Sequence, residues 1–187
     1  MSERAAKDRD WSGAEAHIKS NEDTVKRRLP FINEYIAPGG KALEIGCSSG
    51  FMLDVLREKG MNTVGIEPSD RFGDFLRAKG IQVVNDFKSL SQEKKHNHFD
   101  LIVHFFVMEH MRDPFIFINE QIEALNEHGT IIAEIPIIND PLTSLYTIPA
   151  FEKFYFSIAH HYYYSPKSLK WILDKLPCKY KFVPEQR

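Results

Sequence analysis

Short apolar runs alternate with helical patterns through the middle of this 187-residue chain. Each run is too short for a stable helix, and a segment with apolar residues at helical spacing follows it, often closed by a glycine. Parallel strands need such crossover helices, which then cover both faces of the sheet. The pattern therefore predicts an α/β fold with a doubly wound, mostly parallel sheet. The expected strands are 42–45, 63–66, 81–84, 99–106 and 130–135, and the expected helices are 51–59, 70–79 and 114–125.

The two ends of the chain interrupt this alternation. Residues 1–20 are polar and small and are expected to form an N-terminal arm, followed by a helix that Ser20 or Asn21 caps and that Pro30 kinks or divides. Residues 21–187 are expected to form one domain. Within it, residues 137–164 are rich in Pro, Phe and Tyr and are expected to form an aromatic lid, before a helix that opens at Ser165-Pro166 and a last strand at 180–183.

The charge balance excludes several partners. The chain has 24 Lys and Arg and 26 Asp and Glu, a net charge of −2. It therefore lacks the net positive charge that general binding to nucleic acid or to an anionic membrane requires. No apolar run approaches the length that crosses a bilayer, and the N-terminus lacks a secretory signal, so we expect a cytoplasmic protein. Two cysteines are too few for a disulfide framework or a four-cysteine zinc site, and His96-x-His98 lacks further ligands at metal-binding spacing. No metal is expected.

The turn after the first strand carries the strongest chemical signal. The strand ends at Glu44 and Ile45, and the turn occupies Gly46 to Gly50, with Cys47 and Ser48 in it, directly before a helix. Such a turn is expected to expose backbone amides and to let a ligand approach the main chain. Ser48 stands where the dinucleotide fingerprint Gly-x-Gly-x-x-Gly needs its second glycine, which disfavours a pyrophosphate. The carboxylate of Glu44 would repel phosphate but suits an ammonium group.

A second carboxylate follows the next strand. Glu67 stands at the end of 63–66, where a carboxylate can accept both hydrogens of a ribose diol. An acidic group for an amine and another for a ribose together describe S-adenosylmethionine as the cofactor.

At this point the sequence resembles the class I S-adenosylmethionine-dependent methyltransferases. The resemblance rests on Glu44-x-Gly46-x-x-x-Gly50, on Glu67, on Asn85-Asp86, on Met108-Glu-His110 and on Asp113-Pro, over roughly residues 40–136. It implies a Rossmann-like fold, with S-adenosylhomocysteine as the product. In the family, the turn at Gly46–Ser48 holds the methionine part, Glu67 binds the ribose, Asp86 or its neighbour lies at the adenine, and backbone after the fourth strand closes the site. The implied cofactor-binding set is Glu44, Gly46, Cys47, Ser48, Gly50, Glu67, Pro68, Asp86, Phe87, His104 and Phe105.

The family usually ends with an antiparallel strand pair, which is expected to be incomplete here because only 180–183 remains. The strand at 130–135 would then present an unpaired apolar edge. We expect that the chain is a shortened form, or that the edge is covered by its last strand or by another chain, as in a homodimer through this edge.

A narrower likeness is to methyltransferases that modify sugars in deoxysugar and polysaccharide pathways. It rests on Gly65-Ile-Glu-Pro-Ser69, Ala133-Glu-Ile-Pro136 and His160-x-x-Tyr163-Tyr164-Ser165. In the sugar C-methyltransferases a glutamate precedes the histidine, whereas this chain has Ala159, which weakens proton abstraction from carbon. A small-molecule acceptor is therefore expected, a sugar or sugar nucleotide among them, and oxygen or nitrogen is at least as well supported as carbon.

His110 and His160 are the candidate catalytic residues. His110 follows a parallel strand at the crevice, where a near-neutral imidazole suits general-base work, and His160 belongs to the lid. His110 could equally be a helix-entry histidine bonded to backbone, and His160 a packing residue of the lid. Two other function classes stay open: a non-catalytic domain that keeps this fold for binding, and a nucleotide-dependent oxidoreductase, which Ser48 disfavours.

Overall fold

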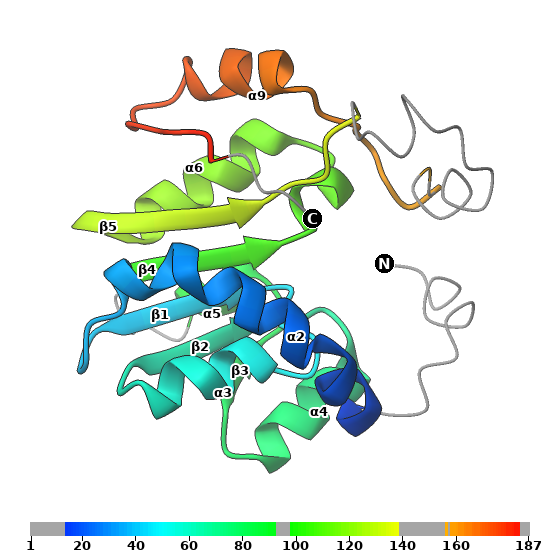
Figure 1. Cartoon of the computed structure of the whole chain (residues 1–187), viewed down its shortest axis with the longest axis vertical. Helices are drawn as coiled ribbons and strands as arrows, with labels where there is room; N and C mark the ends of the chain where they lie inside the picture. The colour runs from blue at the N-terminus through cyan, green and yellow to red at the C-terminus, as the bar shows by residue number, and fades with distance from the viewer. Residues whose placement is uncertain (1–13, 93–97, 139–155, 157, 184–187) are drawn as a thin grey trace.

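The computed structural model describes residues 14–92, 98–138, 156 and 158–183. A five-stranded sheet runs through the middle of the molecule in the order β3-β2-β1-β4-β5, and every pairing in it is parallel (Figure 1). This confirms the predicted α/β, doubly wound architecture. The strands are β1 Lys41–Ile45, β2 Asn62–Ile66, β3 Gln82–Val84, β4 Phe99–Phe105 and β5 Leu125–Glu134.

Helices fill the connections between the strands. They are α2 Ala14–Ile32, α3 Phe51–Glu58, α4 Asp70–Ala78, α5 Phe87–Gln92, α6 Pro114–Ala124 and α9 Pro166–Leu173, with short 3₁₀ turns η1 Asn33–Tyr35 and η2 Met108–His110. The order reverses at β1, because β2 and β3 lie on one side of it and β4 and β5 on the other. The carboxyl ends of strands at such a reversal form the crevice in which open α/β sheets bind ligands.

Side chains that alternate along the strands divide the core into two faces. Ala42 and Leu101 pack with residues of α2 and α3, whereas Leu43 and Ile102 pack with residues of α5, α6 and α9. A third cluster places α4 beside α3, on the same face. The period of two in a strand sends neighbouring residues to opposite faces, which explains why the buried strands read as continuous apolar runs.

The expected helix and strand positions agree with the structure through the alternating region, with small shifts at the ends. Two helix expectations need correction. α2 begins at Ala14 rather than at Ser20 or Asn21, and it continues past Pro30 to Ile32. A short helix, α5, occupies the start of a segment that reads as a polar connection. Six residues give too little periodicity to distinguish a helix from a loop.

The C-terminal part differs more. β5 begins at Leu125, directly after α6, rather than at Thr130, and its register with β4 shifts between Phe99 and Leu101. The strand expected at 180–183 is wrong, because these residues lie in no strand. Among the described residues, β5 pairs with β4 alone and so forms an edge of the sheet. No helix in the described part of the chain is long and apolar enough to cross a membrane.

Candidate functional site

The turn between β1 and α3 requires glycine at two places. Gly46 and Gly50 adopt φ values of 71° and 76°, and Ser48 joins them at 48°. A Cβ on Gly46 would lie 2.8 Å from Cγ2 of Val107, and one on Gly50 would lie 2.4 Å from Cδ2 of Leu76. Both positions therefore combine a left-handed backbone with a close approach, which only glycine accommodates without strain. The turn brings the main chain against the segment that follows β4.

The amides of this turn are used within the protein, which corrects the expectation that they are exposed to a ligand. The N–H groups of Gly46 and Cys47 donate to the carbonyl of Ile66 at 2.8 and 3.3 Å. The N–H of Ser48 donates to Oε2 of Glu67 at 2.8 Å. These hydrogen bonds hold the turn against the end of β2. A ligand could therefore contact the main chain of the turn, but not through the N–H groups of Gly46, Cys47 and Ser48.

Glu44 is a buried carboxylate with unused hydrogen-bonding capacity. It lies at 6% exposure near the end of β1, and its Oε2 atom has no hydrogen-bond partner. The amide of Leu53 in the first turn of α3 donates to this carboxylate, and Arg28 supplies a nearby positive charge. Burial nevertheless raises the pKa of Glu44 to about 8. An uncompensated acceptor in this position suits a cationic or hydrogen-bond-donating ligand.

Glu67 lies at the end of the neighbouring strand and is ordered by two backbone donors. Ser48 and Ser69 each donate an N–H to it at 2.8 Å, one to each carboxylate oxygen. Burial raises its pKa, and the two hydrogen bonds oppose that shift. Glu67 is close enough to Glu44 for their charges to repel. Glu44 lies in β1 opposite Gly65 of β2, and Glu67 directly follows β2. The two carboxylates therefore lie together, as the sequence predicts. Pro68 is exposed directly after Glu67.

The residues expected at the adenine have clear structural roles. Asp86 is exposed, and its Oδ1 accepts from the N–H of Ser89 at 2.7 Å in the first turn of α5. Phe87 is half-buried and packs edge-on against Phe117 at 6.5 Å. Both lie at the carboxyl end of β3, on the crevice side of the sheet. Their contact with a cofactor stays a prediction.

Three further members of the predicted set point into the core. The imidazole of His104 is 2% exposed and packs edge-on against Phe117 at 5.2 Å, and burial lowers its pKa to about 4. Phe105 points to the opposite face, where the guanidinium of Arg28 lies 4.0 Å from its ring. Burial raises the pKa of the Cys47 thiol well above its usual value. These side chains shape the strand ends rather than offer reactive groups, so a cofactor would meet their main chain.

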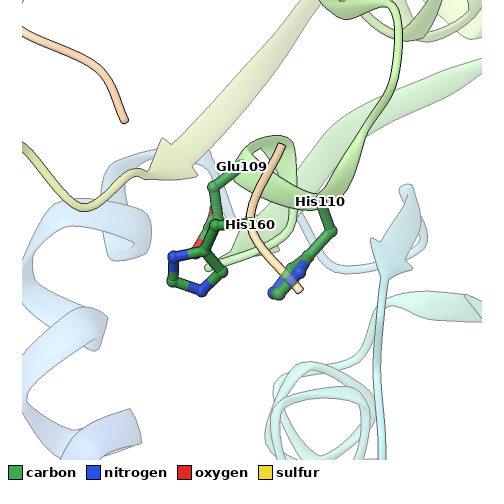
Figure 2. Close-up of side chains that lie close together, drawn as sticks. All are labelled: Glu109, His110 and His160. Atoms are coloured by element: carbon green, nitrogen blue, oxygen red, sulfur yellow. The ribbon is translucent and has the colours of Figure 1, made fainter. Parts of the chain in front are cut away.

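Three chemically active side chains gather where η2 meets the lid. A carboxylate oxygen of Glu109 and one ring nitrogen each of His110 and His160 all lie within 4.8 Å of one another (Figure 2). The two imidazole rings lie 4.8 Å apart at 75° to each other. Both predicted catalytic histidines thus meet in one cluster, although 50 residues separate them in the chain.

Hydrogen bonds fasten this end of the lid to η2. The N–H of His161 donates to the carbonyl of Glu109 at 2.7 Å, and the hydroxyl of Tyr162 donates to the carbonyl of Arg112 at 2.9 Å. Nδ1 of His110 lies 2.9 Å from the carbonyl oxygen of Ala159. Beside the contact between Tyr162 and Arg112, a cleft of about 390 Å³ is lined by Arg112, Phe115, Tyr162, Trp171 and six neighbours. The rest of the lid, residues 139–155 and 157, lies outside the described residues.

Glu109 is the site residue that the candidate set omits. It is 1% exposed, its Oε2 atom has no hydrogen-bond partner, and burial raises its pKa to about 7. The sequence signal was present, because Glu109 directly precedes His110 at the end of the fourth strand. The pattern does not show which of two adjacent polar residues turns inward, since a 3₁₀ turn has no extended period to read.

Comparisons with known proteins assign the chain to a family. A model of the methyltransferase domain matches residues 17–179, most of the chain. The chain belongs to this methyltransferase domain family. The sequence resemblance to methyltransferases is thereby confirmed at the level of the domain, while its narrower likeness to sugar-modifying members is not.

Curated relatives of this methyltransferase domain match about half of it. The ubiquinone biosynthesis O-methyltransferase of Hahella chejuensis is 28% identical over 111 residues, 56% of this chain and 47% of that protein. The protein of the same name from Pelagibacter ubique is 31% identical over 108 residues, 56% of this chain and 44% of that protein. The chain therefore spans about half the length of the curated relatives it matches.

Solved structures extend the likeness to the whole fold. A SAM-dependent methyltransferase from Archaeoglobus fulgidus is 26% identical, with a TM-score of 0.64 over 81% of this chain and 66% of that chain. The plantazolicin methyltransferase BpumL, solved in complex with SAH, is 18% identical, with a TM-score of 0.53 over 66% of this chain and 52% of that chain. The second likeness shows the fold alone. Together they place the methyltransferase domain in the Rossmann-like class that the sequence predicts.

Proposed function

We propose that this domain transfers a methyl group from S-adenosylmethionine to a hydroxyl oxygen of a small molecule. The observation that carries the proposal is the pair of buried carboxylates, Glu44 and Glu67, at neighbouring strand ends beside a glycine turn. Family membership and the solved SAM-dependent relative support the same cofactor. A pair of buried acids is costly to maintain in an apolar core and is retained where a ligand uses it.

The residues present fit this cofactor. The free Oε2 atom of Glu44 can accept a hydrogen bond from an ammonium group. Each oxygen of Glu67 spends one lone pair on a backbone N–H and keeps another for a ribose hydroxyl. Gly46, Ser48 and Gly50 leave no bulky side chain at the turn. Asp86 and Phe87 are assigned to the adenine end. When bound, S-adenosylmethionine supplies a methyl group activated by the positive charge on sulfur.

On the acceptor side, the chain supplies a base. A carbonyl oxygen can only accept a hydrogen bond, so Nδ1 of His110 carries the hydrogen in its contact with Ala159. Nε2 is then the basic nitrogen of the neutral ring. A hydroxyl acceptor must lose its proton as it attacks, and a positioned imidazole accelerates such a step by about 10²–10⁴-fold. We assign this role to His110, with His160 beside it in the acceptor site.

Oxygen is preferred to nitrogen or carbon on two grounds. The curated relatives are named O-methyltransferases. In addition, Ala159 precedes His160, where the sugar C-methyltransferases have glutamate. The hydroxyl can belong to a small molecule of ubiquinone biosynthesis, the process that names the relatives, or to a sugar, which the likeness at 160–165 supports. Either acceptor is a small molecule that enters beside η2 and the lid.

The test is a methyl-transfer assay with labelled S-adenosylmethionine and two soluble acceptors, a dihydroxybenzoate and a nucleoside-diphosphate sugar. Mass spectrometry of the products is expected to show one added methyl group on oxygen. Reactions without acceptor, and reactions with excess S-adenosylhomocysteine, serve as controls. Absence of cofactor binding by isothermal titration would refute the proposal. Tight binding without transfer to any acceptor would favour the non-catalytic alternative.

A further inference from the structure

We infer that Glu109 is a positioning residue that stabilises the protonated imidazole formed at His110 when the acceptor loses its proton. The inference rests on the proposed function and adds to it a residue that neither the family resemblance nor the comparisons assign. Its basis is the placement of a buried, incompletely bonded carboxylate beside two imidazole rings (Figure 2).

The burial of Glu109 is costly unless the carboxylate has a task. The residue is 1% exposed, and its Oε2 atom forms no hydrogen bond. A buried polar atom without a partner costs about 1–3 kcal/mol, and a charged one costs more. Its main chain, by contrast, is well bonded, because its carbonyl accepts the N–H of His161 from the lid. The backbone is thus held firmly, while the side chain keeps an oxygen without a partner and has a carboxylate oxygen within 4.8 Å of each histidine.

The geometry favours an effect on His110. Their polar atoms lie within 4.8 Å, and opposite charges within about 4–6 Å stabilise each other appreciably. The contact with Ala159 fixes Nδ1 as the donor, so a proton taken from the acceptor goes to Nε2. In that step the acceptor O–H bond breaks, an N–H bond forms at Nε2, and the oxygen keeps the electron pair with which it forms its bond to the methyl carbon. The carbon–sulfur bond of the bound cofactor would break as the oxygen–carbon bond forms, with its electron pair going to sulfur and S-adenosylhomocysteine as the leaving group. The proton later leaves His110 for solvent.

The surrounding charges allow Glu109 to respond to this step. Burial is the main reason why its pKa is raised to about 7; its own backbone N–H opposes the shift, and the charge of Glu134 at the end of β5 contributes to it. Arg28 pairs with Glu134 at 2.7 Å and offsets part of that effect. From the lid, the imidazole of His160 and the hydroxyl of Tyr164 face the same region, the latter bonded to the carbonyl of Met108. A positive charge on His110 would therefore shift Glu109 toward its ionised form.

The decisive variant is Glu109→Gln, which keeps the shape of the side chain and removes its charge. With a dihydroxybenzoate as acceptor, we expect the plateau of the pH–rate profile to fall about 10- to 100-fold, less than the loss from His110→Gln. We also expect the rising limb to move to lower pH, because the imidazole loses its stabilising anion. Glu109→Asp keeps the charge, so the rising limb of its pH–rate profile should stay at the wild-type pH. The matched control is Glu123→Gln, an exposed glutamate on α6, with no expected change.

A second measurement needs no acceptor. Carbon NMR of the Glu109 carboxyl should show titration near pH 7 in the wild type. His110→Gln should raise that pKa, because an imidazole that takes up a proton beside Glu109 favours the ionised carboxylate, and glutamine cannot take up that proton. An unchanged Glu109 titration in His110→Gln, or a wild-type pH–rate profile in Glu109→Gln, overturns the inference. If the wild type binds cofactor but methylates no acceptor, the proposed function fails, while this titration still decides whether the two groups are coupled.

Carboxylate and imidazole groups also bind metal ions, so the assay has a metal arm. The protein is treated with a chelator, dialysed and assayed again, with zinc or magnesium added back alone. Unchanged activity after metal removal supports the proton role of Glu109. Activity that disappears and returns with one of the added ions overturns it and assigns Glu109, His110 and His160 to a metal instead.

Discussion

Glu44 and Glu67 lie where the sheet core leaves a carboxylate little water. Each is held by backbone donors, Leu53 for Glu44 and Ser48 with Ser69 for Glu67. The two differ in what they leave unused, since Glu44 keeps an oxygen without a partner whereas both oxygens of Glu67 are bonded. At the residue scale, we therefore expect removal of Glu67 to weaken cofactor binding and removal of the Glu44 charge to change how stability depends on pH.

Replacing Glu67 should weaken cofactor binding. Glu67→Ala removes the acceptor of two backbone N–H groups and of the proposed ribose diol, and a hydrogen bond to a charged group contributes about 1.5–3 kcal/mol. We therefore expect the affinity for S-adenosylhomocysteine to fall at least about tenfold by isothermal titration. Glu58→Ala, which removes an exposed carboxylate at the end of α3, is the control. Unchanged affinity in Glu67→Ala would refute the ribose assignment.

Replacing Glu44 should change how stability depends on pH. The native pKa of about 8 exceeds the ordinary value of 4.5, so the folded state binds this proton more tightly and stability falls as pH rises toward 8. Between pH 6.5 and 8 this amounts to about 2 kcal/mol. The low pKa of His104 has the opposite sign and acts below about pH 6.5, where the unfolded state takes up its proton. Above pH 6.5, the pH dependence of stability therefore reports on Glu44 and not on His104.

The corresponding experiment is urea unfolding of the cofactor-free protein at pH 6.5 and pH 8. Glu44→Gln cannot ionise, so its free energy of unfolding should change less between these pH values than that of the wild type. The contribution of Glu109 is common to both proteins and cancels in the comparison. Equal pH dependence in the two proteins would contradict the raised pKa of Glu44.

At the scale of elements, caps place the helices that border the site. Asp113 accepts hydrogen bonds from the N–H groups of Phe115 and Ile116 at 2.9 and 3.0 Å and so caps α6, which begins at Pro114, four residues after His110. Ser165 and Ser168 form a capping box at the start of α9, just after the lid. Each cap satisfies amides that would otherwise lack a partner, and each sets where the preceding loop must end.

Removing the cap of α6 should cost stability without removing cofactor binding. Asp113→Ala loses two hydrogen bonds, and such losses cost about 1 kcal/mol, or roughly 2–4 °C in melting temperature for a domain of this size. Asp113→Asn keeps a side-chain oxygen and should lie close to the wild type. Thermal unfolding by circular dichroism measures both. A wild-type melting temperature in Asp113→Ala would contradict the capping role.

At the scale of the whole molecule, ligand binding should be visible as stabilisation. A ligand that binds only the folded state at 100 times its Kd adds about 2.7 kcal/mol to the free energy of unfolding. That gain corresponds to roughly 5–10 °C in melting temperature for a domain of this length. We expect a thermal-shift assay to show this increase with S-adenosylhomocysteine and none with NAD. An increase with NAD alone would favour the oxidoreductase alternative.

The edge of β5 is a second property of the whole molecule. In the described part of the chain, β5 pairs only with β4, and the residues at 180–183 add no strand beside it. An unpaired edge is a template for another strand. The homodimer expected through this edge stays a prediction, which light scattering coupled to size-exclusion chromatography over a dilution series would test.

The sequence predicted the elements that have strong periodicity or clear boundary residues. β1 and β4 are continuous apolar runs, and α6 begins at an Asp-Pro pair, so their positions were readable. α5 and the early start of β5 were not, because a six-residue helix has little periodicity and β5 follows α6 without a turn residue between them. The strand expected at 180–183 failed for a related reason, since alternating residues form a strand only where a partner edge is in register.

The sequence by itself determined the parallel sheet, the glycine turn and the order in which Glu44, Glu67 and His110 follow their strands. Those features depend on local periodicity, on φ values that favour glycine and on where each apolar run stops. Only the tertiary structure decided that Glu109 turns inward, that His160 lies beside His110, and that the amides of Gly46, Cys47 and Ser48 are already bonded. These are contacts between segments distant in the chain, and packing of the lid and of β2 fixes them rather than any pattern along one segment.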